Sequence, residues 1–204
     1  MVTQNFAKVQ SRVRSSSSAP TIMKPNYIYL DFPENLEATS NRILGYLFKT
    51  GVFQNPGNWM GPVDLEGLWK DVPELKHWLD SMNLEVEYVA VLGYFQDSGI
   101  HIDEKAKPRI NFPVRNTQGT ATTNFYQLTN LIKTLKFDGK AEYWDLTYDT
   151  ATIIDSYELT QPVLFNPNIP HKVSFNQLLT NKNPRLALTI NFIDAPYYML
   201  DLDS

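Results

Sequence analysis

The part of the chain that most restricts its fold runs from Leu84 to residue 193, where short apolar runs follow one another closely. The runs alternate apolar and polar side chains and are rich in β-branched and aromatic residues, which favours strands. They are LEVEYVAVLGYF, RINFPV, TTNFYQL, KAEYWDLTY, TIIDSYEL, PVLF, HKVSF and RLALTINFI, with the turn-prone sequences NTQG, DGK and NPN between some of them. Many short strands without a long helix between them predict a closed or two-sheet antiparallel architecture.

One strand and one helix are predicted near the start of the chain. Residues 26–32 (NYIYLDF) read as a short strand. Residues 33–50 then show the spacing of an amphipathic helix, with Gly51 as its C-terminal stop. Residues 51–62 are rich in Gly, Pro and Asn and predict a loop.

A second amphipathic helix is predicted after Asp71, because Glu74 three residues later completes a capping signal. Its apolar stripe consists of Leu75, Trp78, Leu79 and Met82. His77 lies off this stripe, so we interpret it as a solvated helix residue and not as a metal ligand.

The 204 residues suffice for one well-filled domain and are few for two. We expect residues 1–24 to form a flexible polar tail, because they cannot bury enough apolar surface to offset the entropy of ordering. An acid-poor start rich in Arg and Ser is also typical of a transit peptide, but this one is short and weakly amphipathic. Residues 25–204 are then expected to form a single domain.

Charge and composition exclude several classes of function. The net charge of −4 is spread along the chain without a basic stripe, so no direct nucleic-acid binding is expected. No apolar run is long enough for a membrane span, and we expect a soluble, cytoplasmic protein without a membrane partner. The sequence contains no cysteine, so a metal must be held by nitrogen and oxygen ligands. The oligomeric state is not specified by the sequence.

The sequence offers such ligands at His101 and Asp103, which stand two residues apart. On a strand, side chains at i and i+2 leave the same face, with Cα atoms roughly 7 Å apart, so both can reach one metal ion. Further along the chain, His171 follows Pro170, which favours an extended entry. Two imidazoles and one carboxylate make the facial triad of a non-haem Fe(II) site with open coordination positions.

Together with Arg185, fourteen residues after His171, the triad resembles the signature of the 2-oxoglutarate-dependent Fe(II) oxygenases. The resemblance covers residues 84–193 and extends to prolyl- and aspartyl/asparaginyl-hydroxylase-like members. It implies a double-stranded β-helix, a jelly roll of the cupin type, with the N-terminal helices packed on one sheet. It also implies His101, Asp103 and His171 as metal ligands at the catalytic centre, with Fe(II), 2-oxoglutarate and O2 as cofactors and ascorbate as a stimulant. The reaction would hydroxylate a C–H bond of a peptidyl or small-molecule substrate and release succinate and CO2.

In this resemblance Arg185 binds the far carboxylate of 2-oxoglutarate. If residues 171–175 and 185–193 form a hairpin, His171 lies opposite Thr189, and Arg185 lies roughly 13 Å further along the sheet. A guanidinium is the natural bidentate partner of a carboxylate at that distance from the metal.

A second donor to the cosubstrate must come from elsewhere in the chain. The family often has Ser or Thr two residues after this Arg, where this chain has Ala187. The candidates are Thr189, Tyr94 and Tyr126.

The stretch PRINFPV resembles the strand that follows the first two ligands in the aspartyl/asparaginyl-hydroxylase-like members. Arg109 and Asn111 share one face of that strand and are expected to contact the cosubstrate as well. A structural cross-strand hydrogen bond by Asn111 is the equal alternative.

Two other functions fit the same sequence. The triad could hold a divalent metal in a cupin-like protein that is not an oxygenase. The fold could also be a structural jelly-roll module without a metal. Formation of succinate from 2-oxoglutarate separates the first of these from an oxygenase, and metal analysis separates the second.

Overall fold

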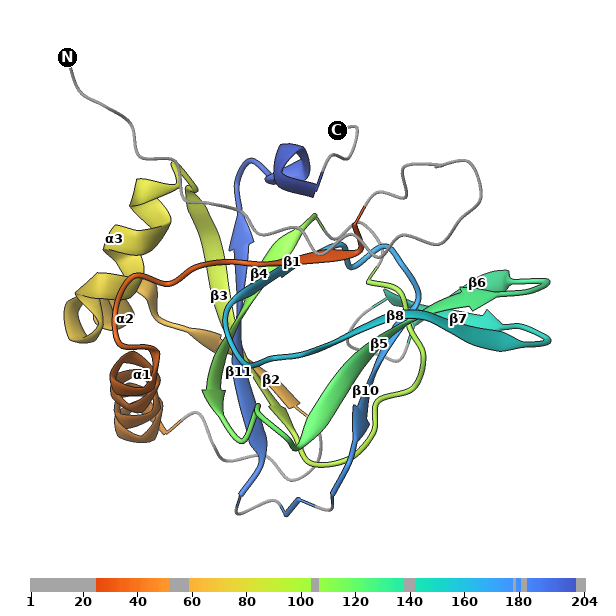
Figure 1. Cartoon of the computed structure of the whole chain (residues 1–204), viewed down its shortest axis with the longest axis horizontal. Coiled ribbons are helices and arrows are strands. Elements are labelled where there is room, and N and C mark those ends of the chain that lie inside the picture. The colour runs from red at the N-terminus through yellow and green to blue at the C-terminus, as the bar shows by residue number, and fades with distance from the viewer. Residues whose placement is uncertain are drawn as a thin grey trace, which may run out of the picture.

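The computed structural model describes residues 25–51, 59–103, 107–137, 142–177, 179–180 and 183–200. The tail predicted for residues 1–24 lies outside this part. Within it the chain is mainly β, as predicted, with strands in three antiparallel sheets and a group of helices on one side (Figure 1). No helix in the described ranges is long and apolar enough to cross a membrane.

The described strands are β1 (Tyr27–Tyr29), β2 (Trp59–Val63), β3 (Val86–Tyr94), β4 (Arg109–Arg115), β5 (Ala121–Leu128), β6 (Ile132–Phe137), β7 (Glu142–Thr147), β8 (Ala151–Glu158), β9 (Val163–Phe165), β10 (His171–Phe175) and β11 (Arg185–Phe192). The helices are α1 (Leu36–Thr50), α2 (Leu65–Asp71) and α3 (Pro73–Ser81), with a 3-10 turn at Tyr197–Leu200.

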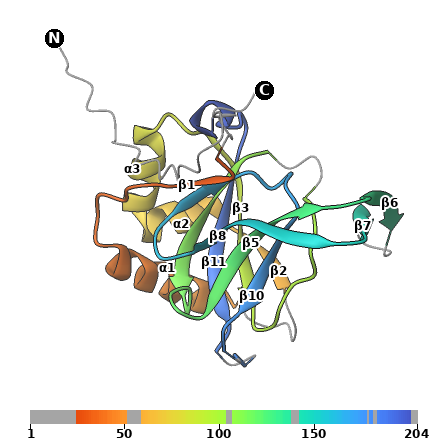
Figure 2. The same cartoon turned by 45° about the vertical axis from the view of Figure 1, so that its right-hand side comes forward.

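Among these elements a six-stranded sheet has the order β1-β9-β4-β11-β3-β2, and a three-stranded sheet has the order β10-β5-β8. We call them the large sheet and the small sheet. The strands β6 and β7 form a separate hairpin that points away from both (Figures 1 and 2).

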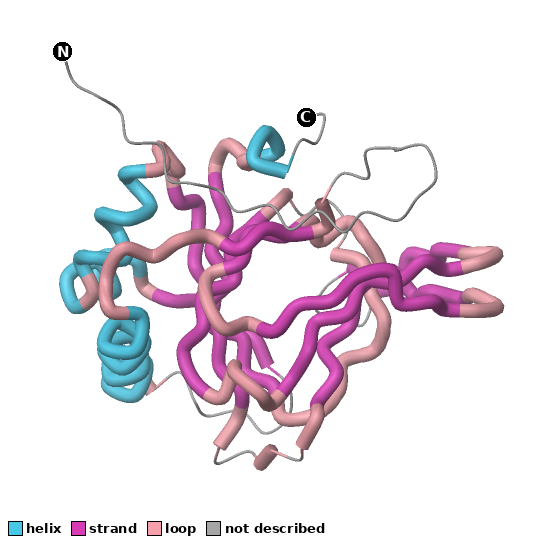
Figure 3. Tube along the Cα trace, viewed as in Figure 1, coloured by secondary structure: helices cyan, strands magenta, loops and turns pink. Residues whose placement is uncertain are grey.

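The two faces of the large sheet have opposite chemistry because side chains alternate along each strand. On β11, Leu186, Leu188, Ile190 and Phe192 join the main hydrophobic core. That core also contains Ile43, Leu47 and Leu79 from the helices, which cover this face of the sheet (Figure 3). The helices therefore pack on one sheet, as expected, and leave its other face toward the small sheet.

The first helix agrees with the prediction except at its start. It begins at Leu36, because the side chain of Asn35 accepts a hydrogen bond from the backbone N–H of Ala38 at 3.0 Å and caps it. Residues 33 and 34, predicted to open the helix, lie before this cap. Gly51 ends the helix in the left-handed conformation at φ 74°, as predicted.

The second predicted helix is displaced, and a further helix precedes it. Asp71 does not cap α3 but ends α2, which is capped by Asp64 through the backbone N–H of Gly67. A new helix then starts with Pro73 at its first position, where the missing N–H costs nothing. His77 is exposed on α3, as interpreted from its place off the apolar stripe.

Two strands were missed in the sequence. Residues 59–63, predicted as part of a loop, form β2 and pair with β3 at the edge of the large sheet. The Pro and Gly that suggested a loop are tolerated there because the strand is an edge strand. Residues 132–137, for which no strand was predicted, form β6 opposite β7.

The predicted hairpin between residues 171–175 and 185–193 is wrong. In the structure β10 pairs with β5, with His171 opposite Phe125, whereas β11 pairs with β3 and β4. The two segments thus belong to different sheets, and Thr189 lies opposite Asn111 and Ala90. The two segments are close in sequence, which favoured the hairpin. However, β11 is buried along its whole length and therefore needs a hydrogen-bonded strand on each edge, which β3 and β4 provide.

Candidate metal centre

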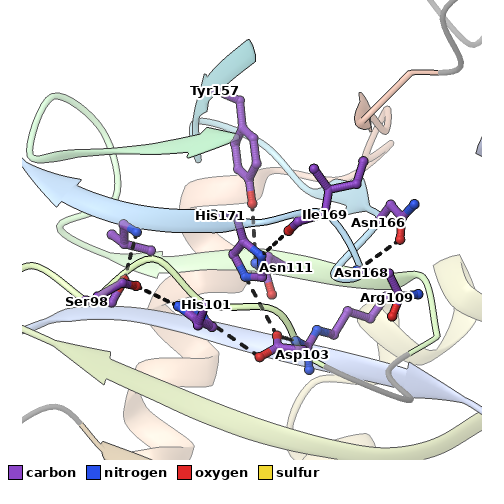
Figure 4. Close-up of polar contacts among 12 residues, drawn as sticks. Ser98, His101, Asp103, Arg109, Asn111, Tyr157, Asn166, Asn168, Ile169 and His171 are labelled. Carbon is purple, nitrogen blue, oxygen red and sulfur yellow. Dashed lines mark hydrogen bonds and ion pairs between the residues drawn. The ribbon is translucent and has the colours of Figure 1, made fainter. Parts of the chain in front are cut away.

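Three side chains converge between the two sheets. His101 and Asp103 lie in the extended segment between β3 and β4, and His171 is the first residue of β10 (Figure 4). One ligand atom from each lies within 4.8 Å of the other two. This arrangement can hold one metal ion through two imidazoles and one carboxylate.

The segment that carries His101 and Asp103 is not a regular strand, contrary to the prediction. His101 makes an isolated β-bridge with His171, in which each backbone N–H donates to the other residue's carbonyl, at 3.0 and 2.9 Å. The backbone N–H of Asp103 donates to the carbonyl of Pro167 at 3.1 Å. These bonds hold the side chains of His101 and Asp103 on the same side of the segment, while Ile102 between them is buried.

Both imidazoles are oriented by backbone carbonyls. His101 Nδ1 lies 2.8 Å from the carbonyl oxygen of Gly99, and His171 Nδ1 lies 2.9 Å from that of Ile169. Each contact assigns the ring proton to Nδ1, which leaves the lone pair of Nε2 free for a metal. The Nε2 atoms lie 3.8 and 3.7 Å from the two oxygens of Asp103.

Burial keeps both histidines neutral. It lowers the pKa of His171 to about 3, with the neighbouring His101 and Arg109 acting in the same direction against the raising effect of the Ile169 carbonyl. Burial likewise lowers the pKa of His101. A neutral imidazole is the form that binds a metal, so the site needs no deprotonation of these rings at neutral pH.

Arg109 on β4 adds a positive charge beside the triad. Its guanidinium forms an ion pair with Asp103 and lies over the ring of Phe165, with 5.5 Å between the guanidinium carbon and the ring centroid. Burial lowers the pKa of this guanidinium, and nearby Tyr88 and Tyr94 oppose that shift. Asp103 is thus positioned by a charged partner from the large sheet.

The face of the large sheet turned toward the small sheet carries five polar side chains that are unusual for an interior. Each has a fully buried polar atom without a hydrogen-bond partner in the described part of the chain. We call these residues the polar face and their unpartnered atoms orphaned: Arg109 (Nε), Asn111 (Oδ1), Arg185 (Nε), Thr189 (Oγ1) and Asn191 (Nδ2). Such atoms cost about 1 to 3 kcal/mol each when unsatisfied, so they indicate a polar ligand or water between the sheets.

Arg185 lies at one end of the polar face. Its side chain is almost fully enclosed, with 2% exposed, and it lies opposite Tyr94 on β3. Burial lowers the pKa of Arg185, and Tyr157 and Tyr94 raise it again. No described residue forms an ion pair with it, which leaves a buried cation available for an anion.

The other candidates for the cosubstrate are divided between two surfaces. Thr189 and Asn111 lie opposite each other on the polar face, and Asn111 Nδ2 donates to the hydroxyl of Tyr157 at 3.4 Å (Figure 4). Tyr94 lies beside Arg185. Tyr126 lies on β5 of the small sheet, opposite Ile153 on β8 and just after the irregularity that follows Phe125, whereas Arg185 lies on the large sheet.

Two residues of this interior were missed in the sequence. Asn191 could have been found, because RLALTINF alternates between Arg, Ala, Thr and Asn on one face and apolar residues on the other. Tyr157 carries no such signal, since an aromatic residue in a strand is ordinarily core.

A scan of protein-family models and a search of curated proteins find no match to this chain. Fold and site therefore define the class: a mainly β protein of two facing sheets with a candidate His/Asp/His metal centre between them.

Proposed function

We propose that this protein is an Fe(II)- and 2-oxoglutarate-dependent oxygenase that hydroxylates a peptidyl or small-molecule substrate. The observation that carries the proposal is the polar face, where a buried unpaired guanidinium and further orphaned polar atoms share one interior with the metal triad. A dicarboxylate bound at the metal would supply the missing partners.

The order of strands supports a double-stranded β-helix as the fold. From β3 onward the chain passes from the large sheet to the segment bridged to the small sheet at His101, and then back to β4. It continues to β5 and β8 of the small sheet, β9 of the large, β10 of the small and β11 of the large. This winding between two facing antiparallel sheets is what a jelly roll requires.

The donor set fits Fe(II). Two neutral imidazoles and one carboxylate are the protein ligands of a non-haem Fe(II) site, and three coordination positions would stay open for other ligands. The carbonyls of Gly99 and Ile169 fix the direction of the rings, and Arg109 fixes Asp103. When bound, the metal with its cosubstrate would supply the oxidising chemistry.

Arg185 would hold the far carboxylate of 2-oxoglutarate, because a buried guanidinium without an ion-pair partner is well suited to bind one in bidentate fashion. Thr189 and Tyr94 share its face of the sheet and offer hydroxyl donors in place of the family's Ser or Thr. Next to His171, the rings of Phe125 and Phe165 lie with centroids 6.3 and 5.5 Å from the imidazole and help to exclude water.

The proposal is tested by incubating the full chain with Fe(II), ascorbate, O2 and 2-oxoglutarate labelled at its first carboxyl group. We expect release of labelled CO2 and matched formation of succinate, stimulated by the right substrate and slow without one. The Asp103→Ala variant serves as the control for adventitious iron chemistry and should release neither.

Two results would replace the proposal with its rivals. If the protein binds about one metal ion per chain but neither binds nor consumes 2-oxoglutarate, the site belongs to a cupin-like protein of another function. If the folded protein binds no Fe(II), Co(II) or Mn(II), the fold is a jelly-roll module without a metal.

A further inference from the structure

We propose that the substrate carries a carboxylate, and that Arg109 and Asn191 bind it beside the metal triad. This inference rests on the proposed function and names the class of substrate. It assigns to Arg109 a role separate from that of Arg185.

Two orphaned atoms at this end of the polar face are donors, and the orphaned acceptor Asn111 Oδ1 lies further along, opposite Thr189. Arg109 Nε–H and Asn191 Nδ2–H have no acceptor among the described residues. Ile190 on β11 pairs with Ile110 on β4. Asn191 follows Ile190 and Arg109 precedes Ile110, so in this antiparallel pair Arg109 and Asn191 are neighbours on the opposite face of the sheet from the two isoleucines. A group that only accepts hydrogen bonds satisfies both donors, and an ionised carboxylate is such a group.

The balance of charge points in the same direction. Arg109 and Arg185 bring two buried positive charges, and Asp103 is the only carboxylate in the described ranges that forms an ion pair with either. A divalent metal and the dianion 2-oxoglutarate cancel each other, so one positive charge would remain in the interior. A substrate with a carboxylate would neutralise it, whereas an uncompensated buried charge is costly.

The two arginines are anchored at opposite ends of the polar face. Arg185 lies opposite Tyr94, and Asn191 lies opposite Tyr88, six residues further along β11. At about 3.3 Å per residue these positions are roughly 20 Å apart along the strand. The long side chains of the two arginines reach toward a shared region, because Tyr94 and Tyr157 act electrostatically on both guanidinium groups. The carboxylate at Arg109 is assigned to a second group by the charge balance and by the orphaned donor of the neighbouring Asn191.

Solvent reaches the end of the sheet at which Arg109 lies. Tyr88 is 46% exposed and acts electrostatically on Arg109, whereas Arg185 is enclosed. A substrate can approach from this side while the cosubstrate stays at the enclosed end.

The test compares acids with amides of the same shape. Acetate, butyrate and phenylacetate, and their primary amides, are titrated into Zn(II)-loaded full-length protein with and without 2-oxoglutarate, and binding is followed by ligand-observed NMR. We expect at least one acid to bind about tenfold or more tightly than its amide, in keeping with one charged hydrogen bond of about 1.5 to 3 kcal/mol.

The variants decide which residue is responsible. Arg109→Gln should abolish the preference for acid, Arg109→Lys should retain part of it, and Asn191→Leu should reduce it. Arg115→Gln, the same change on the same strand but away from the polar face, is the control and should bind as the wild type does. Metal content is measured for each variant, since Arg109 also contacts Asp103.

Equal binding of every acid and amide, or an acid preference that survives Arg109→Gln in the presence of saturating 2-oxoglutarate, overturns the inference; 2-oxoglutarate is needed there because Arg185 and the metal would otherwise accept a carboxylate too. So does a loss of 2-oxoglutarate binding in Arg109→Gln with no change in Arg185→Leu, which would make Arg109 the cosubstrate ligand. A failure of the oxygenase proposal is seen separately, because the same titrations show whether 2-oxoglutarate itself binds to the Zn(II) protein.

Discussion

At the scale of single residues, the triad depends on which ring nitrogen of each histidine is free. The Gly99 and Ile169 carbonyls occupy the Nδ1 side, so both Nε2 atoms face Asp103. The carboxylate is the only charged member of the three. Its loss should therefore damage the site more than the loss of any residue that merely orients a ligand.

We expect Asp103→Ala to lose metal affinity by more than about a hundredfold, the upper end of the effect of removing an orienting partner. Two neutral imidazoles alone bind Fe(II) weakly. Equilibrium dialysis of the folded variant against Co(II) measures the change. His77→Ala, which removes an exposed imidazole from α3, is the control and should bind Co(II) like the wild type. Full metal binding by Asp103→Ala would contradict the assignment of the centre.

We expect Arg185→Leu to keep the metal and to lose 2-oxoglutarate. Arg185 contacts no ligand atom of the triad, but its removal would leave the far carboxylate buried without a charge partner. That typically costs about 2 to 5 kcal/mol, or roughly thirtyfold to several thousandfold in affinity. Calorimetric titration of the Mn(II)-loaded protein measures it, with Arg115→Leu as the charge control. Normal 2-oxoglutarate binding by Arg185→Leu would shift the role to another residue of the polar face.

The sequence could name these residues as candidates because metal ligands and anion-binding arginines have a restricted chemistry, and the structure brings His101, Asp103 and His171 together. It could not show that Arg109 contacts Asp103, since that contact joins a loop to a strand through side-chain packing. Nor could it separate Tyr94, opposite Arg185 on the large sheet, from Tyr126 on β5 of the small sheet, because a tyrosine fits either face of a strand.

At the scale of elements, local sequence signals predicted where a helix ends and which segments are strands. The end of α1 at Gly51 and the strand character of β3 and β11 follow from capping and period-2 alternation. The predicted pairing of β10 with β11 is wrong, because the choice of a strand's partner depends on contacts between residues distant in sequence. The Asp71 signal failed for a local reason: Asp64 caps α2, which ends at Asp71, and Pro73 then starts α3.

The two glycines of α1 should respond to alanine with opposite signs. Gly51 has φ 74°, where a Cβ is strained, so Gly51→Ala should lower the free energy of unfolding by about 1 kcal/mol. Gly45 is exposed within the helix and a Cβ there meets no atom within 4 Å, so Gly45→Ala should raise it by about 0.5 to 1 kcal/mol. Urea unfolding of both variants checks this, and the same sign for both would contradict the cap.

At the scale of the whole molecule, the large sheet separates two environments. One face joins the helices in an apolar core, and the other holds buried charge and orphaned polar atoms next to the triad. Burial of these polar and titratable groups without partners costs free energy, and a bound metal and polar ligands would offset part of that cost. Without metal, this burial should show itself in the stability of the entire fold, and His171 provides the clearest measure.

We expect the metal-free protein to lose stability as the pH falls from 7 to 5. The pKa of His171 is about 3 in the folded protein and near 6.5 when the chain unfolds. Between these values only the unfolded chain takes up the proton, so acidification favours unfolding. The free energy of unfolding then decreases by up to about 1.4 kcal/mol per pH unit, and His171 accounts for roughly 2 kcal/mol between pH 7 and 5. The lowered pKa of His101 adds a loss of the same sign.

The measurement is urea unfolding of the chelator-treated protein at pH 7, 6 and 5, compared with the His171→Gln variant. The variant starts less stable or more stable according to how well the amide packs, but its pH dependence should be shallower by the contribution of one imidazole, about 2 kcal/mol over this range. His77→Gln removes an imidazole from the exposed surface of α3 and controls for the change in composition. Parallel pH profiles for the wild type and His171→Gln would mean that His171 is not held neutral in the folded chain. The description of His171 as a buried, neutral imidazole oriented by a backbone carbonyl would then be wrong, whatever metal the protein binds.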